Sequence, residues 1–584
     1  MNMPHGSRPE YAIKVEKNVP AKMRDGVTLH ADVYRPDAEG RFPVILLRLP
    51  YGKHMASDFG DHEFFPARGY VVIIQDGRGR FDSEGTYYPL IDEPFDGYDT
   101  VEWAASLPYS NGMVGTQGQS YLGATQYLLA PTRPPHLRCA FPVSAAADFH
   151  DSWVYHGGAF SLGWQIPYAI FMVRNTIERM GLKDELWPKI RPDLLRSINF
   201  GNPMTPEAYT RLPLMYWADL LKDTSPYIRD YLTHPEDGPY WWAVNVERQH
   251  HNISIPMYHV SSWYDIFLKD AIVHFNGLRS RAMTPEARGG QRLLLGPWAH
   301  LFPYTTPTTG GTGDIDFGPN AFMDLHDVQL RWFDYWLKGV DTGISEESPI
   351  RLFVMGTNQW RDEYEWPLAR TRYTPYYLHS RGKANTLNGD GALSLEVPGE
   401  EPTDQYRYDP ANPVPTNGGN TLIIPVGVKD QREVESRPDV LVYTGAPQEK
   451  PLEVTGPLKV VLYASSSALD TDFTAKLVDV RPDGYAQNIA DGILRARYRE
   501  SQTTPKFLNK DDVYEFTIDL WATSHVFLPG HCLRVEISSS NFPRFDRNLN
   551  TGGDQATGTT WQVAEQTVFH NQKFRSHILL PVIP

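Results

Sequence analysis

Apolar runs and helix-like segments alternate along the first quarter of the chain. Strands are expected at residues 27–34, 43–49, 69–76, 111–119 and 138–146, and helices at 96–108 and 121–130. The first segment alternates apolar and polar positions, which is typical of a strand with one buried face. The second and third are continuous apolar runs bounded by Gly or Pro, as expected for strands that helices cover on both sides. This alternation of strands and helices predicts a parallel α/β sheet.

A helical insertion is expected next, because no series of strands is visible from residue 148 to about 249. Its helical stretches are rich in aromatic residues, and buried-strand runs return after it. The elements expected in this part are helices at 166–181, 205–223 and 264–280, strands at 255–262 and 291–297, and a helix that ends at Gly339. The returning strands indicate that the same sheet continues on the far side of the insertion.

The last part of the chain has a different pattern. Residues 514–520 and 533–538 alternate apolar and polar side chains strictly, and Gly, Pro and Asn are frequent between such segments. This pattern predicts an antiparallel β-sandwich. The expected organisation is an α/β core in two parts (1–146 and 250–345), an inserted helical cap (147–249) and a C-terminal β domain (346–584).

Composition narrows the function classes. The chain has 584 residues and a net charge of −15, which argues against nucleic-acid binding, since that needs a basic patch. Two separate thiols are favoured over a bridge between Cys139 and Cys532. The first residues lack the apolar core of a signal peptide and no run of 18 apolar residues occurs, so a cytoplasmic protein without a membrane span is expected. The many aromatic residues indicate a cavity for an apolar or aromatic ligand.

The segment GTQGQSYLGATQYLLA (115–130) carries the candidate nucleophile, Ser120. Gly118 and Gly123 flank it in a pattern of the G-x-S-x-G type. Chance supplies G-x-S-x-G in roughly one chain in five of this length, so a serine in a tight turn is the alternative. The context favours a nucleophile, because the motif follows an expected buried strand and opens an expected helix. Such a turn lifts the hydroxyl above the sheet, beside a helix N-terminus that stabilises negative charge.

A serine nucleophile needs a base and an acid that orients the base, and in this fold class they follow in the order Ser, Asp or Glu, His. Asp265 follows the expected strand in the segment SSWYD, and His300 follows the next one in GPWAH. Ligands bind at this end of the strands in open α/β sheets. Alone, Asp265 could be the N-cap of a helix and His300 a surface residue. Their order and placement together favour a catalytic triad.

The other histidines and acids fit a catalytic or metal site less well. His54 and His62 precede the nucleophile, which is the wrong order for this fold class. His250 and His251 are adjacent, so their side chains diverge, and no zinc ligand set lies near them. The acids of GDIDFG, Asp314 and Asp316, are candidates for a cation site, but a solvated loop is favoured.

These residues resemble the cocaine esterase/X-Pro dipeptidyl-peptidase group of serine hydrolases (the CocE/NonD and S15 proteins), in particular its cocaine esterase-like branch. The segments GQSYLG, SSWYD and GPWAH look like the three triad blocks of that group. Further similar blocks, spread over nearly the whole chain in the expected order, are LRLPYGKH (47–54), QDGRGRFDSEG (75–85) and SSSNFPRFDRNLNTGG (538–553). The resemblance implies an α/β-hydrolase core, an inserted helical cap and a C-terminal jelly roll of the galactose-binding type.

The resemblance also implies roles for five further residues. An oxyanion hole is expected from the Tyr51 hydroxyl, in the segment LPYG, and from the backbone N–H of Tyr121. The segment SWVYHGGAFSLGW resembles the start of the family's cap, whose tryptophans line the acyl pocket. Trp153, Trp164 and Phe267 are therefore expected to contact substrate, although packing alone would also explain them.

The expected activity is two-step hydrolysis of small carboxylic esters with a bulky or aromatic acyl group, through an acyl-enzyme and without metal or organic cofactor. The first alternative is an amidase, an acylase or an X-Pro dipeptidyl-peptidase that uses the same triad. A binding protein that holds carbohydrate on the jelly roll, with an idle core, is the second. No nucleic-acid or membrane partner is expected, and a homodimer is left open.

Overall fold

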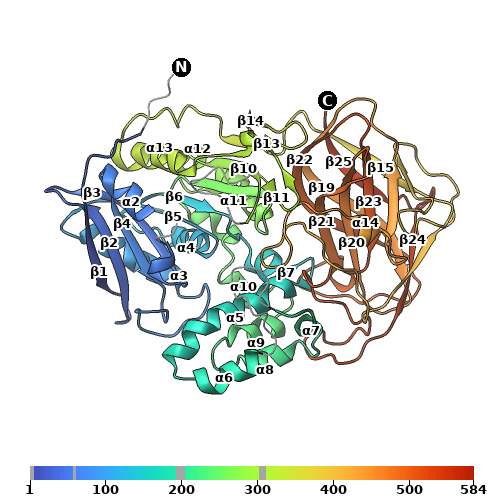
Figure 1. The fold of residues 1–584 in the computed structure, drawn as a ribbon, viewed down its shortest axis with the longest axis horizontal. Coiled ribbons are helices and arrows are strands. Elements are labelled where there is room, and N and C mark those ends of the chain that lie inside the picture. The colour runs from blue at the N-terminus through green and yellow to red at the C-terminus, as the bar shows by residue number, and fades with distance from the viewer. Residues whose placement is uncertain (1–5, 57–60, 192–203, 301–310) are drawn as a thin grey trace.

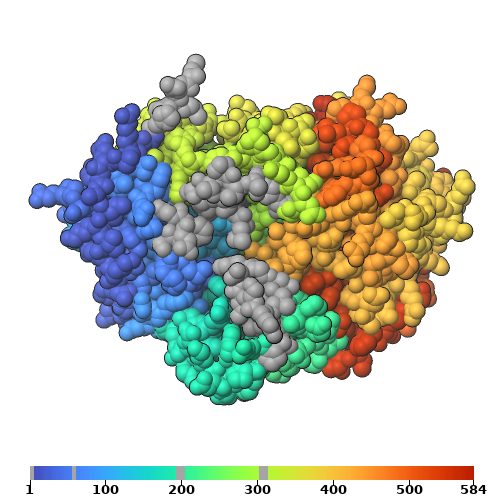
Figure 2. All heavy atoms as spheres, in the orientation of Figure 1, coloured from blue at the N-terminus to red at the C-terminus, as the bar shows by residue number. Residues whose placement is uncertain are grey.

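The computed structural model describes residues 6–56, 61–191, 204–300 and 311–584. Figure 1 shows three parts: an α/β core, a helical cap below it, and a C-terminal β domain at the right. The space-filling view in Figure 2 shows the cap against the underside of both other parts. The helical cap leaves the core after one strand and returns before the next, as the pattern of apolar runs predicts.

The core is built on a ten-stranded sheet with the order β1-β2-β4-β3-β5-β6-β9-β10-β13-β14. The strands are β1 Ile13–Lys22, β2 Thr28–Pro36, β3 Phe42–Leu49, β4 Val71–Asp76, β5 Ser110–Gln119, β6 Leu137–Val143, β9 Tyr258–Tyr264, β10 Arg292–Ala299, β13 Ile350–Val354 and β14 Gln359–Glu363. The central strands from β4 to β13 pair in parallel, and antiparallel strands flank them on both sides. The predicted parallel sheet is confirmed.

Helices cover both faces of this sheet, which explains the continuous apolar runs. The helices of the core are α1 Lys53–Ala56, α2 Asp61–Phe64, α3 Glu93–Ser106, α4 Tyr121–Leu129, α11 Leu268–Arg281, α12 Pro285–Gly289 and α13 Leu325–Lys338. On β3, Val44 and Leu46 belong to the cluster that contains α3 and α4. Ile45 and Leu47, between and after them, join the cluster that contains α13. Every position from Pro43 to Leu49 is therefore buried, and no polar alternation remains.

The cap is mainly helical, as expected, but it also holds a small hairpin. Its elements are β7 Tyr155–His156, β8 Ala159–Phe160, α5 Leu162–Arg179, α6 Lys183–Ile190, α7 Pro206–Tyr209, α8 Met215–Leu220, α9 Tyr227–Thr233 and α10 Pro239–Trp242. The single helical stretch expected at 205–223 is wrong, since α7 and α8 are separate helices. Pro213 lies between them, and a proline lacks the N–H that a continuous helix requires.

The C-terminal part is an antiparallel β domain apart from one short parallel pair, β16–β18. Its strands are β15 Arg372–His379, β16 Ala392–Ser394, β17 Asp404–Tyr408, β18 Leu441–Gly445, β19 Leu452–Ser466, β20 Asp472–Val480, β21 Ala486–Arg495, β22 Tyr514–Phe527, β23 Cys532–Ser538, β24 Ala564–Phe569 and β25 His577–Ile583. On β22 Phe516, Ile518 and Leu520 are buried, while the alternating Glu515, Thr517 and Asp519 are exposed, as the pattern predicts. The finer jelly-roll assignment stays a prediction.

Other expectations compare with the structure as follows. The core sheet continues to Glu363, past the expected division at residue 345, because β13 pairs with β10. The helix expected from residue 264 begins at Leu268, since β9 extends to Tyr264. Both cysteines are free. None of the helices in the described part of the chain has the length and apolarity that a membrane span needs.

Candidate active site

Ser120 occupies a strained turn between β5 and α4. Its φ of 61° and ψ of −122° lie in a region that residues other than glycine rarely adopt. The turn is fixed from both sides, because the Ser120 N–H donates to the carbonyl of Val143 on β6 and its own carbonyl accepts from the first turn of α4. A side chain held in such a conformation at the end of a buried strand is typical of a nucleophile elbow.

The two glycines explain how the turn fits. A Cβ on Gly118, whose φ is 139°, would lie 2.4 Å from the side chain of Leu122. A Cβ on Gly123 would lie 2.7 Å from the Cβ of Ala145. The spacing of the second glycine differs from G-x-S-x-G by one residue, since Leu122 stands at that position. Gly123 is the residue that faces β6, so close packing of α4 on the sheet places the glycine there.

Asp265 and His300 meet at the same edge of the sheet. Asp265 directly follows β9 and His300 directly follows β10, and these two strands pair in parallel. His300 Nδ1 lies 3.3 Å from Asp265 Oδ1, and both side chains are buried. The main-chain carbonyl of His300 accepts a hydrogen bond from the side chain of Gln119, the residue before Ser120. The structure thus places Asp265 and His300 in contact and links the His300 main chain to the residue directly before Ser120.

Three further groups hold the Asp265 side chain and its turn. The Phe267 N–H donates to Oδ1 of Asp265 over 2.7 Å, and the Ser144 hydroxyl donates to Oδ2. The amide of Asn420, from the C-terminal domain, donates to the carbonyl oxygens of Trp263 and Asp265, both over 2.9 Å. The N-cap of α11 is Phe267, not Asp265, so the alternative of a simple capping role is wrong. The Asp265 carboxylate acts as the acceptor in the hydrogen bonds from Phe267 and Ser144.

The Tyr51 side chain lies beside that of Ser120. Tyr51 follows β3, and its hydroxyl interacts with the Ser120 side chain and lies 3.3 Å from the Tyr168 hydroxyl on α5. Burial raises the pKa of Tyr51 to about 12, against the effects of these two hydrogen bonds and of the charge on Arg80, so the phenol keeps its proton at neutral pH. A protonated hydroxyl at this place is able to donate a hydrogen bond to a negatively charged oxygen.

The Tyr121 N–H is the second expected oxyanion donor. Tyr121 is the first residue of α4, and its N–H makes no hydrogen bond to any other residue in the described ranges. N–H groups of the first helical turn have no partner within the helix and point toward anions. Its side chain is buried, and its hydroxyl accepts from the Leu90 N–H. The arrangement leaves the main chain of Tyr121 available to a ligand while its ring anchors the helix.

Aromatic rings from the cap and from the Asp265 turn form one cluster beside His300. Trp153 stacks on Phe267 with ring centroids 5.1 Å apart, and Phe267 meets the His300 ring edge-on at 5.5 Å. Trp164 packs on Trp153 at 5.2 Å and donates its indole N–H to the Trp153 carbonyl. Tyr121 approaches the same Trp153 ring at 6.2 Å. The three residues expected to contact substrate therefore lie together and next to the candidate triad.

The remaining candidates lie elsewhere or have other partners. His54 packs on Phe81 at a separate cavity, and His62 on Tyr34. His250 is bonded to His274 over 2.9 Å, within a buried group of neutral histidines. Asp314 pairs with Lys429, and Asp316 accepts from a backbone N–H. No cluster of three or more metal-ligating side chains is found in the described part of the chain.

Sequence reasoning missed Ser144, Tyr168 and Asn420. Ser144 has a φ of 47°, and neither this strain nor its contact with Asp265 leaves a sequence signal. Tyr168 is one of many aromatic residues in an aromatic-rich helix. Asn420 lies 155 positions from Asp265, in the C-terminal domain, and no motif marks it. These contacts exist only once the chain has folded.

The comparisons with known proteins show the family of the chain. Residues 25–302 match the model of the X-Pro dipeptidyl-peptidase (S15) family, and residues 342–579 that of the X-Pro dipeptidyl-peptidase C-terminal non-catalytic domain. The chain is 38% identical to a cocaine esterase from Rhodococcus sp. (strain MB1 Bresler), over 97% of this chain and 98% of that protein.

Two solved structures are similar over the full length. One is an aminopeptidase from the marine sediment archaeon Thaumarchaeota archaeon, with 26% identity, a TM-score of 0.82 and coverage of 100% of this chain and 99% of that one. The other is an α-amino acid ester hydrolase, with 27% identity, a TM-score of 0.81 and coverage of 99% and 98%. The chain therefore belongs to the X-Pro dipeptidyl-peptidase (S15) family of serine hydrolases, and is an ester hydrolase of that family.

Proposed function

We propose that this hydrolase cleaves small carboxylic esters with a bulky or aromatic acyl group, using Ser120 as nucleophile, His300 as base and Asp265 as the orienting acid. The observation that carries the proposal is the buried contact between Asp265 and His300. The His300 carbonyl also accepts a hydrogen bond from Gln119, which directly precedes the strained Ser120. Nucleophile, base and orienting acid lie in the order and at the strand ends that this fold class uses.

The reaction proceeds in two steps. His300 takes the proton of Ser120 as Oγ attacks the ester carbonyl, and Asp265 stabilises the resulting imidazolium. Tyr51 and the Tyr121 N–H donate to the oxyanion of the tetrahedral intermediate. His300 then gives its proton to the departing alcohol, and water attacks the acyl-enzyme by the same route in reverse. Each transfer stays within the residues described above, and no cofactor enters the scheme.

The acyl group is proposed to lie against the cluster of Trp153, Trp164 and Phe267. Its rings offer flat apolar surfaces next to His300, which suit an aromatic or bulky acyl group. Two acids near these residues in sequence bond within the protein: Asp151 pairs with Lys269 over 3.0 Å, and Oδ1 of Asp270 accepts from the Ala147 N–H. A substrate with a free amino group would need an acid that is not so engaged, which favours simple esters over amino-acid or X-Pro substrates.

The experiment that tests this function combines labelling with a substrate panel. A fluorophosphonate probe is expected to form an adduct on Ser120, located by mass spectrometry of the digested protein. Benzoyl and acetyl esters of nitrophenol are expected to be hydrolysed, the benzoyl ester with the higher kcat/KM. Turnover confined to Xaa-Pro anilides or to esters with a free α-amino group would instead support the amidase and peptidase alternative.

Removal of the Phe267 ring is expected to change selectivity. In Phe267→Ala the ratio of kcat/KM for a benzoyl over an acetyl ester should fall about 10-fold, because the lost ring contacts the larger acyl group only. The ratio is the quantity to measure, since any disturbance of Asp265 or His300 affects both esters. Phe275→Ala serves as control, because Phe275 is equally buried on α11 but lies outside the aromatic cluster. A ratio that is the same in both variants would contradict the proposed acyl pocket.

A further inference from the structure

Arg80 is a buried cation without an acidic partner. Its side chain is 2% exposed, and it makes no ion pair with any residue in the described ranges. Among the other buried arginines of the described residues, Arg48 pairs with Glu93 and Arg495 with Asp472, whereas Arg292 shares with Arg80 the lack of an acidic partner and binds main-chain carbonyls. Burying an unpaired charge is costly, and such groups are concentrated at functional sites.

The hydrogen bonds of Arg80 join two elements of the candidate active site. Nε donates to the carbonyl oxygen of Pro50 over 2.7 Å, and Pro50 directly precedes Tyr51. Nη1 donates to the Met172 carbonyl over 3.0 Å and to the Thr176 hydroxyl over 2.9 Å, both on α5. One guanidinium therefore fixes the end of β3 against the long helix of the cap.

The same helix places the partner of the Tyr51 hydroxyl. Tyr168 lies on α5 one turn before Met172, and its hydroxyl is 3.3 Å from that of Tyr51. Arg80 thus acts on Tyr51 in two ways. It binds the carbonyl of the preceding Pro50 directly, and it acts on the Tyr51 hydroxyl through α5, which carries Tyr168. A shift of this helix relative to the core would move the Tyr51 hydroxyl from its place beside Ser120.

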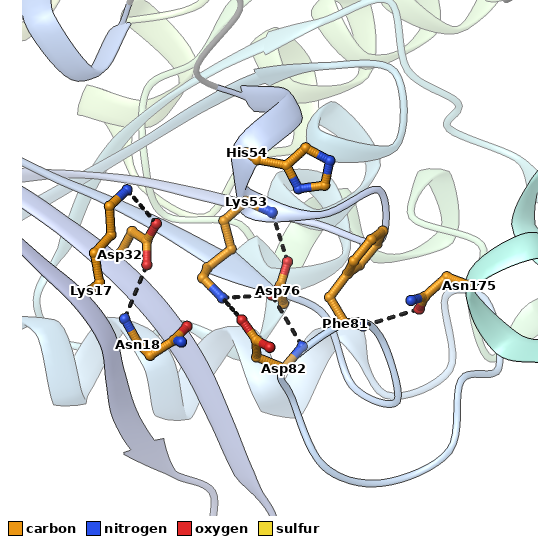
Figure 3. Close-up of a pocket in the computed structure, with 9 residues that line it drawn as sticks. All are labelled: Lys17, Asn18, Asp32, Lys53, His54, Asp76, Phe81, Asp82 and Asn175. Carbon is orange, nitrogen blue, oxygen red and sulfur yellow. Dashed lines mark hydrogen bonds and ion pairs between the residues drawn. The ribbon is translucent and has the colours of Figure 1, made fainter. Parts of the chain in front are cut away.

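The loop that carries Arg80 is itself attached to the cap. The Phe81 N–H donates to the Asn175 side chain over 3.0 Å, and both residues line a cavity of about 500 Å³ (Figure 3). In the same view Lys53 is bonded to Asp76 and Asp82, which holds the chain just after Tyr51. The ion pairs of Lys53 therefore hold the chain just after Tyr51, and Arg80 holds the residue just before it.

The charge of Arg80 also acts on the site. Its guanidinium lies over the Tyr87 ring at 4.9 Å, and no carboxylate of the described residues neutralises it. The positive charge opposes the effect of burial on the Tyr51 pKa. A cation near a buried phenol makes its hydroxyl a stronger hydrogen-bond donor, so the charge acts on the oxyanion through Tyr51.

We propose that Arg80 is a positioning residue for hydrolysis: it fixes Tyr51 against α5, and its buried positive charge makes the Tyr51 hydroxyl a stronger donor to the oxyanion. The proposal rests on the proposed function, in which Tyr51 donates to the oxyanion. Arg80 itself touches neither substrate nor the reacting atoms. Its effect on the rate must therefore pass through Tyr51, and this requirement makes it testable.

The test is a double-mutant cycle on the hydrolysis of a nitrophenyl benzoate ester. Arg80→Met is expected to lower kcat about 10- to 100-fold with KM within about 3-fold, since the interaction matters most in the transition state. Tyr51→Phe is expected to lower kcat about 100- to 1,000-fold. The double variant should be within about 3-fold of Tyr51→Phe alone. Losses that multiply, or an unchanged kcat in Arg80→Met, would overturn the proposal.

Two further variants separate positioning from general stability. Arg78→Met makes the same change in the same loop, but Arg78 pairs with Asp96 on α3. This variant should lower the Tm and leave kcat unchanged. Arg80→Lys keeps the charge and should lose less activity than Arg80→Met, and it replaces that variant in the cycle if Arg80→Met does not fold. A Ser120→Ala variant that still hydrolyses the ester would refute the proposed function, whereas additive losses in a Ser120-dependent enzyme refute the role of Arg80 alone.

Discussion

Ser120→Ala is expected to lower kcat/KM for a nitrophenyl ester by about 10⁴- to 10⁶-fold. The alanine side chain has no oxygen to attack the carbonyl, and Asp265 and His300 are then unable to act without their nucleophile. The residual rate would come from the oxyanion donors and from substrate binding. The measurement is steady-state hydrolysis together with the loss of the fluorophosphonate adduct.

A matched serine in the same sheet provides the control. Ser261 on β9 is as small and more deeply buried, and its hydroxyl bonds to no residue that the structure describes. Ser261→Ala should therefore keep both the activity and the adduct. Because alanine tolerates the strained φ and ψ no better than serine, Ser120→Ala should also unfold at a Tm close to that of the parent protein. Hydrolysis that persists in Ser120→Ala would show that another residue is the nucleophile.

The sheet and the placement of its active-site edge could be predicted because local sequence determines them. The continuous apolar runs at 43–49 and 69–76 require cover on two faces, and the helices that provide it lie next to them in sequence. Once the strands are parallel, residues that follow them must meet at one edge. Ser120, Asp265 and His300 could be found in this way, without any knowledge of how the cap folds.

The support around these residues could not be predicted, since it depends on contacts between distant segments. The Asn420 amide approaches the Asp265 turn from the C-terminal domain, and Arg80 reaches across to α5 in the cap. Each bond is only one of several that an amide or guanidinium is able to make, so the residue type gives no partner. Tyr51 is a related case: its proposed oxyanion role is implied by the family resemblance alone, because an aromatic residue after a strand is more often part of a core.

The helix division in the cap shows the limit of local signals. A helical stretch was expected across 205–223, whereas the chain forms α7 and α8 with Pro213 between them. Proline removes a donor and restricts the residue before it, but many prolines are accommodated at the start of a helix, as Pro206 is here. Which prolines interrupt a helix is decided by the packing around them.

Asp265→Asn is expected to lower kcat about 10⁴-fold while changing KM little. The Asp265 carboxylate accepts from Phe267, Ser144 and His300, so all its partners are donors. An asparagine must turn its NH₂ group toward at least one of them, and it carries no charge to stabilise the imidazolium. Either change raises the energy of the transition state. The measurement is single-turnover acylation with a nitrophenyl ester, which separates chemistry from product release.

Asp270→Asn is the matched control on the helix that follows. Asp270 is buried like Asp265, but it accepts from the Ala147 N–H and the Ser152 hydroxyl, and burial raises its pKa to about 7. A raised pKa in the folded state means that the native protein binds the extra proton between about pH 4 and 7, so Asp270 lowers stability as the pH rises through that range. Asp270→Asn should therefore remove part of that pH dependence, measured by urea unfolding, and keep kcat within about 3-fold. Equal losses of kcat in both variants would mean that acylation depends on any buried acid at this junction of cap and core, and would exclude a specific role for the bond between Asp265 and His300.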